Sequence, residues 1–175
     1  MSRTNGALEF HAFDSTLDPL LTKLCVKYPE KRFYRRMKHG YQHCYVLIDR
    51  NEIVAYAWVT TSTCYVSELD FMLPIGLGRF YIYDCFVDEA FRGRGLYQAL
   101  LGKIIADYAT LRWPGQFTAA CIAAEPGNIA SIRGIRRAGF KEFARARYIQ
   151  IGKVTRLYGV NTLVSFMNST ADPLR

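Results

Sequence analysis

Residues 80–101 read FYIYDCFVDEAFRGRGLYQALL and hold the most informative pattern in the chain. Residues 80–87 are apolar except for Asp84, which is typical of a central strand that is buried on both faces. After a glycine-rich turn, apolar residues recur every four positions from Leu96 to Tyr108, as they do in an amphipathic helix. The segment therefore predicts a strand, a turn and a helix in direct succession.

The glycine-rich turn is suited to binding an anion. The first N–H groups of a helix have no intrahelical acceptor, and the helix dipole favours negative charge at the same end. Gly93 and Gly95 would let a phosphate approach the backbone, and Arg92 and Arg94 add positive charge. The turn is not a P-loop or a dinucleotide fingerprint, because Gly-Lys-Ser/Thr and the third glycine are both missing. Taken alone, it also fits an ordinary tight turn with two solvated arginines.

The segment before residue 80 predicts strands and helices in alternation. We expect a first strand over residues 7–13, followed by a helix that is capped by Asp14 or Ser15. A second, strongly basic helix is expected over residues 30–38, and two apolar runs within residues 44–61 predict a β-hairpin. The apolar face of the first helix would consist of Leu17, Leu20, Leu21, Leu24 and Cys25.

The remaining segments complete one domain over residues 1–175. Residues 63–79 contain Pro74, Gly76 and Gly78 and are expected to be mostly loop. A further strand is predicted over residues 117–124, and a short helix from Asn128 to Ala138 should end at Gly139. Two closing strands are expected in RYIQIGK (147–153) and TRLYGVNTLV (155–164), before a polar tail over about residues 165–175. This order indicates an α/β protein with a mixed sheet.

Composition narrows the class of protein. Half of the 175 residues are hydrophobic, which is enough for a packed core. The net charge of +8 suits an anionic partner, but no helix-turn-helix, zinc-finger or RNP pattern supports nucleic acid. The sequence shows no secretion signal and no long apolar run, so we expect a cytoplasmic protein that does not enter a membrane. The five cysteines and three histidines lack metal-ligand spacing, and we expect free thiols and no metal.

A second motif follows in residues 125–140, EPGNIASIRGIRRAGF. Arg92 to Tyr97 resembles the R-x-x-G-x-G/A coenzyme A loop of the GNAT acyltransferase superfamily. Asn128-x-x-Ser131, followed by Ala138-Gly139-Phe140, resembles the N-x-x-A/S and G-F element of the same superfamily. The two motifs occur in the family's order and at its usual separation, and together they cover residues 80–140.

This resemblance implies a fold and an activity. The implied fold is the GNAT fold, with a mixed sheet of about six to seven strands and helices on both faces. The sheet would splay between the central strand and the strand after the coenzyme A helix. The implied activity is transfer of an acetyl or similar short acyl group from acetyl-CoA to a primary amine. A non-catalytic acyl-CoA-binding domain and a protein N-acetyltransferase are the alternatives, and the sequence leaves open whether the chain forms a homodimer.

The resemblance also implies where coenzyme A binds. Backbone groups of the central strand and of Ala123 would face the pantetheine arm, and the amides at the start of the next helix would hold the pyrophosphate. Arg133, Arg136, Arg137 and Lys141 would either bind the adenosine 3′-phosphate or form a solvated helix face. The residues implied in coenzyme A binding are Phe86, Val87, Arg92, Gly93, Arg94, Gly95, Leu96, Tyr97, Gln98, Asn128 and Ser131.

Two positions depart from the family pattern. Tyr97 stands where the loop usually ends in a small residue, and Ile135 stands where many members carry the tyrosine that protonates the leaving thiolate. Ser131 is our substitute for that acid, although it also fits a helix-cap or packing residue. Asp84, a carboxylate within an apolar strand, is the first candidate for the base or for an anchor of the acceptor, against a structural hydrogen-bonding role. Glu68 and Asp70 are the other candidates.

A basic segment gives an indication of the class of acceptor. Residues 27–38, KYPEKRFYRRMK, hold six basic residues and one acidic residue, and the resemblance places such a segment beside the acceptor cleft. Cations there would attract an anionic acceptor. We therefore expect a small amine that bears a carboxylate or phosphate, bound by Arg32, Arg35 and Arg36. A solvated helix face or a contact with a partner protein would explain the same residues.

Overall fold

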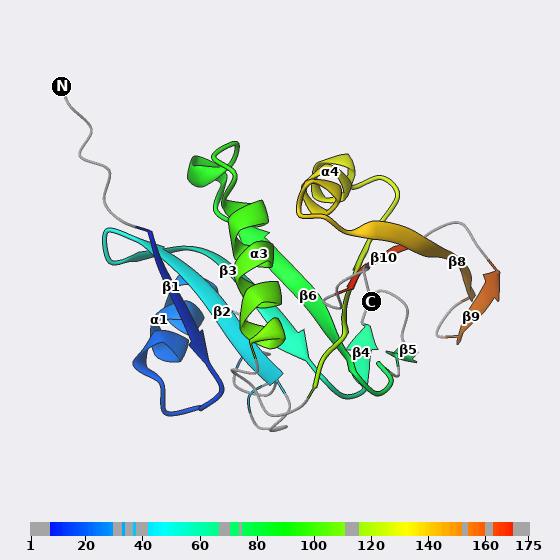
Figure 1. Cartoon of the computed structure of the whole chain (residues 1–175), viewed down its shortest axis with the longest axis horizontal. Coiled ribbons are helices and arrows are strands. Elements are labelled where there is room, and N and C mark those ends of the chain that lie inside the picture. The colour runs from blue at the N-terminus through cyan, green and yellow to red at the C-terminus, as the bar shows by residue number, and fades with distance from the viewer. Residues whose placement is uncertain are drawn as a thin grey trace.

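A computed structural model of the chain (Figure 1) describes residues 8–29, 33, 37, 42–66, 71–73, 75–110, 116–151, 154–159 and 163–169. Its helices are α1 (Pro19–Lys27), the short 3-10 helix η1 (Glu89–Phe91), α3 (Leu96–Ala109) and α4 (Ile129–Arg137). Its strands are β1 (Glu9–Phe13), β2 (Gln42–Asp49), β3 (Glu52–Thr60), β4 (Cys64–Val66), β5 (Phe71–Leu73), β6 (Arg79–Val87), β7 (Ala119–Ala124), β8 (Lys141–Ile151), β9 (Val154–Gly159) and β10 (Leu163–Ser169).

The described strands form a mixed sheet in the order β1-β2-β3-β6-β7-β10-β8-β9. The pair β6 and β7 is parallel, and the other neighbours are antiparallel. The predicted α/β class and mixed sheet are confirmed, with one strand more than the expected six to seven. Strands β4 and β5 form a separate antiparallel pair within residues predicted to be mostly loop.

The hairpin of β2 and β3 is confirmed and has a clear local cause. Its two turn residues, Arg50 and Asn51, have φ angles of 50° and 68°. Two-residue turns with positive φ at both positions match the twist of the strands that they connect. The strands pair from Asp49 and Glu52 outward to Gln42 and Thr60.

Helices cover both faces of the sheet, as predicted (Figure 1). Successive residues of β2 alternate between two cores. Tyr45 and Leu47 lie in the core shared with α3 and α4, whereas Cys44 and Val46 lie in the core shared with α1. On the α3 side, Leu100, Leu101 and Ile104 are fully buried, and burying such a side chain contributes about 1.5–3 kcal/mol. This packing fixes α3 against the strands that precede and follow it.

Helix α1 begins later than the sequence analysis predicted. Its N-cap is Asp18, whose carboxylate accepts a hydrogen bond from the Leu20 amide at 2.8 Å, and neither Asp14 nor Ser15 caps it. Leu17 lies before the helix and is 88% exposed, while Leu21 and Leu24 are buried as expected. Asp followed by Pro at the first helical position is a strong start signal, and it outweighs the apolar periodicity that included Leu17. Of the predicted basic helix, the structure describes Phe33 and Met37, which are helical and buried.

The C-terminal segment also differs from the prediction. Residues 165–169 form most of β10 and are not the start of a polar tail. Strand β10 lies between β7 and β8 and pairs with both. Backbone hydrogen bonds to both neighbours stabilise this strand although its sequence includes Ser and Asn. The polar residues therefore did not indicate where the strand ends. Among the helices that the structure describes, none is long and apolar enough to span a membrane.

Candidate functional site

Strands β6 and β7 separate at the centre of the sheet. They pair from Arg79 and Ala119 as far as Ile82 and Ile122, although β6 continues to Val87. Along its other edge β6 stays paired with β3, and the register shifts between Tyr56 and Trp58. Beyond Ile82, β6 therefore has β3 on one side and diverges from β7 on the other. This is the splay that the family resemblance implied.

The register shift forms a bulge at Asp84. Asp84 has a φ angle of 45°, a left-handed conformation that aspartate tolerates better than most residues, and its side chain is exposed. The sequence analysis treated this carboxylate as part of a buried, apolar strand. The bulge explains the difference, because an extra residue in one strand breaks the inward and outward alternation of side chains.

Helix α3 starts at the end of this splay without a side-chain cap. Its N-cap is Gly95, which has a φ angle of 76°, while Asp18 and Asn128 cap α1 and α4 with their side chains. The first intrahelical acceptor is the Gly95 carbonyl, which is bonded by the Ala99 amide at 3.0 Å. The amides of residues 96–98 have no intrahelical partner and face the space before the helix. The uncapped N-terminus of α3 therefore lies where the sequence predicted an anion site.

The backbone of the turn leaves room for a ligand. Gly93 also has a positive φ angle, of 78°. A Cβ atom at Gly93 would meet nothing within 4 Å, and one at Gly95 would meet only the Gln98 Oε1 atom at 4.0 Å. Backbone conformation therefore favours glycine at these two positions, and the adjoining space is open.

The two arginines of the turn fold back onto it. Arg92 donates from Nε to the Val87 carbonyl at 3.2 Å and pairs with Glu89 at 3.0 Å. Arg94 donates to the Ala90 carbonyl at 3.4 Å, and its guanidinium lies 4.9 Å from the ring centroid of Phe91. Both guanidinium groups thus stabilise the turn while they keep positive charge beside it.

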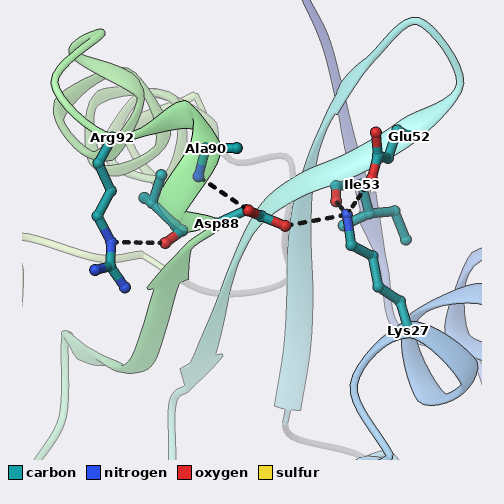
Figure 2. Close-up of polar contacts among 7 residues, drawn as sticks. Lys27, Glu52, Ile53, Asp88, Ala90 and Arg92 are labelled. Carbon is teal, nitrogen blue, oxygen red and sulfur yellow. Dashed lines mark hydrogen bonds and ion pairs between the residues drawn. The ribbon is translucent and has the colours of Figure 1, made fainter.

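A charged network fixes the base of the turn (Figure 2). Lys27, the last residue of α1, donates to Glu52 Oε1 at 2.6 Å and to the Ile53 carbonyl at 2.7 Å, and it pairs with Asp88 Oδ2 at 3.3 Å. The other oxygen of Asp88 accepts from the Ala90 amide at 3.2 Å. That backbone hydrogen bond and Lys27 lower the pKa of Asp88. Burial opposes the charge of Lys27, but its hydrogen bonds to Glu52 and Asp88 outweigh burial and raise its pKa.

A cavity of about 830 Å³ opens at this point. It lies where β6, the glycine-rich turn, α3 and α4 meet. Most of the predicted coenzyme A residues line it, although Arg94 does not. The lining residues are Cys85, Phe86, Val87, Phe91, Arg92, Gly93, Gly95, Leu96, Tyr97, Gln98, Asn128, Ala130, Ser131, Gly134 and Arg137.

Helix α4 contributes polar groups to one wall of the cavity. Asn128 caps the helix, and its Oδ1 atom accepts from the Ser131 amide at 3.1 Å. The Ser131 hydroxyl lies 3.2 Å from the hydroxyl of Tyr97 on α3. Ile135 is fully buried in the core and does not line the cavity. The side chain of Tyr97, which stands where the family has a small residue, therefore reaches α4, a contact that no sequence spacing indicates.

The other residues predicted for the site differ in where they lie. Arg136 pairs with Glu142 at 3.1 Å, whereas Arg137 lines the cavity. Asp84 belongs to the bulge and not to the cavity lining. Glu68, Asp70, Arg32, Arg35 and Arg36 lie outside the described residues. Across the described ranges there is no cluster of three His, Cys, Asp or Glu side chains that could hold a metal ion.

Comparisons with known proteins agree with this geometry. NAA60 from Arabidopsis thaliana in complex with acetyl-CoA shares 17% identity, with a TM-score of 0.64 over 93% of this chain and 98% of that one. A GNAT acetyltransferase from Elizabethkingia anophelis with acetyl-CoA bound shares 13% identity, with a TM-score of 0.61 over 95% and 99%. The ribosomal-protein-S18-alanine N-acetyltransferase from Escherichia coli shares 13%, with a TM-score of 0.61 over 97% and 99%. These likenesses show the fold.

The family assignment comes from the sequence. No match to a curated protein sequence was found. The model of the acetyltransferase (GNAT) family, however, matches residues 10–140, which include the splay, the turn and α4. The protein is therefore a member of the GNAT acetyltransferase family.

Proposed function

We propose that the protein transfers an acetyl or similar short acyl group from acyl-CoA to a primary amine. The observation that carries this proposal is the uncapped N-terminus of α3, which faces a cavity at the splay between β6 and β7. Acetyltransferases of this family use acetyl-CoA as the co-substrate, and two of the similar structures contain it. An uncapped helix N-terminus fits a pyrophosphate, and the open backbone edge of β6 fits the amides of a pantetheine arm.

The lining residues divide the cavity into three parts. The amides of residues 94–98 would hold the pyrophosphate, and Phe86 and Val87 would offer backbone groups to the pantetheine arm. The capping bond uses the oxygen of the Asn128 amide, so its nitrogen is the group that would donate to a pantetheine carbonyl. Arg137 is the best placed cation for the 3′-phosphate, because Arg136 is paired with Glu142.

The chemistry needs a base for the amine and a donor near the thioester sulfur. Asp84 is our candidate base or acceptor anchor, because the bulge presents its carboxylate at the surface beside the splay. Glu68 stays a second candidate. Ser131 lines the cavity and is the candidate donor that the sequence supplied.

The acceptor class is a separate part of the proposal. We favour a small amine with a carboxylate or phosphate group, bound by Arg32, Arg35 and Arg36. Lys27 does not contribute to such a site, since Glu52 and Asp88 neutralise its charge. The resemblance in fold to a ribosomal-protein N-acetyltransferase makes a protein N-terminus the alternative acceptor.

We also propose that the chain forms a single domain and that the protein is cytoplasmic. One sheet includes both β1 and β10, which supports a single domain over the whole chain. None of the five cysteines forms a disulfide in the structure, as is usual in a reducing compartment, which supports a cytoplasmic location.

The function is tested with purified protein, acetyl-CoA and a panel of amines, with free thiol as the readout. The panel contains amino acids, sugar nucleotides, spermidine and peptides with free N-termini. Acetyl-CoA should raise the thermal midpoint, because a ligand at 100 times its Kd adds about 2.7 kcal/mol. An amine in the panel should then release thiol, and mass spectrometry should find the acetylated product. Binding without turnover of any amine would favour the non-catalytic alternative.

A further inference from the structure

The ring of Tyr97 bridges α3 and α4. A Cβ atom at Gly134 would stand 2.4 Å from Tyr97 Cδ1 and 2.8 Å from Tyr97 Cε1. The ring therefore occupies the space that any side chain at Gly134 would need. Its hydroxyl lies 3.2 Å from Ser131 Oγ, one turn earlier on α4, and the partly buried Tyr97 also packs against the core beneath α3. These contacts hold the ring in one position.

The ring covers the middle of the α4 face that lines the cavity. Residues three apart are neighbours on the surface of a helix, and Ser131, Gly134 and Arg137 all line the cavity. Ser131 and Arg137 are about 9 Å apart along the helix axis, and Gly134 lies halfway between them. The Tyr97 ring therefore divides this wall into two parts. The polar part lies at Asn128 and Ser131, and the cationic part lies at Arg137.

The anion site at the start of α3 adjoins the same ring. Tyr97 belongs to the first turn of α3, and the side chains of a helix lean toward its N-terminus. The ring and the amides of residues 96–98 therefore face the same space. On the basis of the function proposed above, a pyrophosphate at these amides lies next to the ring. The pantetheine arm then lies toward Asn128, and the 3′-phosphate lies toward Arg137.

We propose that the Tyr97 ring determines the path of coenzyme A through the cavity. The ring blocks a straight path along α4, so the ligand must bend around it at the pyrophosphate. This bend directs the 3′-phosphate to Arg137. A small residue at position 97 would instead leave the row from Asn128 to Arg137 open. Tyr97 is thus a positioning residue, and it makes the site select coenzyme A over ligands that lack the 3′-phosphate.

The test compares the affinities for coenzyme A and for dephospho-coenzyme A, which lacks the 3′-phosphate, by titration calorimetry. The wild type should bind coenzyme A about tenfold more tightly, as expected for a hydrogen bond to a charged group. Tyr97→Ala should reduce this ratio to about twofold or less. Tyr97→Phe, which keeps the ring on Gly134, should retain the wild-type ratio. Gly134→Ala is a second way to displace the ring and should lower the ratio as Tyr97→Ala does.

Two arginines of α4 supply the remaining comparisons. Arg137→Gln should lower the ratio in the wild type, but it should cause no further loss in Tyr97→Ala, because the ring acts through Arg137. Arg133→Gln is the matched control on the same helix. Arg133 is exposed and does not line the cavity, so this variant should keep the wild-type ratio.

A wild-type ratio in folded Tyr97→Ala and Gly134→Ala would overturn the proposal, because a purely structural loss weakens both ligands equally. Loss of the ratio in Tyr97→Phe would also overturn it, since the hydroxyl and not the ring would then be responsible. A ratio near one in the wild type would show that no phosphate is directed to Arg137, with the same consequence. Failure of the wild type to bind either ligand would instead refute the function on which the proposal rests.

Discussion

Lys27 Nζ and Asp88 Oδ2 lie 3.3 Å apart and join the end of α1 to the residue that follows β6 (Figure 2). The Asp88 amide also donates to the Val54 carbonyl at 2.9 Å. The base of the glycine-rich turn is thus tied to the opposite face of the sheet, far in sequence from the turn itself. A contact with α1 therefore holds the backbone that would bind the pyrophosphate.

Lys27→Met should weaken acetyl-CoA binding by a few-fold, because it removes the ion pair that joins Asp88 to the end of α1. The loss should appear in Kd by calorimetry and in KM, with little change in kcat. Lys23→Met is the matched control on the same helix, because Lys23 donates to the exposed Asn51 side chain at 3.3 Å and does not touch the network at Asp88. Equal effects of the two substitutions would mean that the network does not hold the turn.

Asp84→Asn should reduce turnover by about 10²- to 10⁴-fold, the range typical of a positioned base, and leave the Kd for acetyl-CoA unchanged. Asparagine suits this position because it tolerates positive φ angles as aspartate does. Asp84→Gly removes the carboxylate and relieves any backbone strain. Both variants should lose activity equally. Full activity in Asp84→Gly would show that the carboxylate takes no part in catalysis, and equal loss of folding and activity would mark a structural role.

A Cβ atom at Gly134 would lie 2.4 Å from Tyr97 Cδ1 and 2.8 Å from Tyr97 Cε1. Gly134→Ala should therefore displace the Tyr97 ring and destabilise the protein by about 1–3 kcal/mol. In a Tyr97→Ala background the same substitution should be neutral or stabilising, since alanine is the better helix former. Chemical unfolding of the four proteins gives the coupling energy between the two positions. Additive effects would contradict the packing of Tyr97 on Gly134.

The buried His43 should make stability depend on pH. Burial lowers its pKa from 6.5 to about 4, and its ring bonds the Tyr108 hydroxyl. The unfolded chain therefore takes up a proton at higher pH than the folded chain, so stability is lost as the pH falls from 6.5 toward 4. The loss from pH 7.5 to 4.5 should be about 2–3 kcal/mol. Urea unfolding of the wild type and of His43→Gln from pH 7.5 to 4.5 would measure this loss of stability. The variant should lack the part of the pH dependence that His43 causes. Parallel curves would contradict the assignment.

The sequence predicted those elements whose ends are set by neighbouring residues in the chain, such as helix ends and tight turns. Gly139 was expected after α4 and has a φ angle of 90°, and the hairpin of β2 and β3 was expected from its two apolar runs. The features that were missed depend on residues far apart in sequence. No periodicity shows where β6 shifts register against β3, so the exposure of Asp84 was not foreseen. Strand β10 forms because β7 and β8 offer it hydrogen-bonding edges on both sides. The position of the Tyr97 ring is possible only because Gly134 has no side chain.

The candidate site was predicted best where backbone chemistry defines it. Gly93, Gly95 and Asn128 line the cavity, and the sequence singled them out because their spacing is tied to backbone conformation and helix capping. The base and the acceptor residues depend on side chains that different loops and helices bring together. Several of these, Glu68 and Arg35 among them, lie outside the described residues.

The binding of acetyl-CoA to Gly95→Asp, measured by titration calorimetry, tests the central claim most directly. An aspartate at Gly95 would place a carboxylate beside the α3 amides and repel the phosphates. Gly102→Ala, at an exposed α3 position where a Cβ meets nothing within 4 Å, is the control and should bind as the wild type does. We predict that Gly95→Asp stays folded and shows no binding heat and no shift of the thermal midpoint. Wild-type affinity in folded Gly95→Asp would contradict a pyrophosphate site at the start of α3.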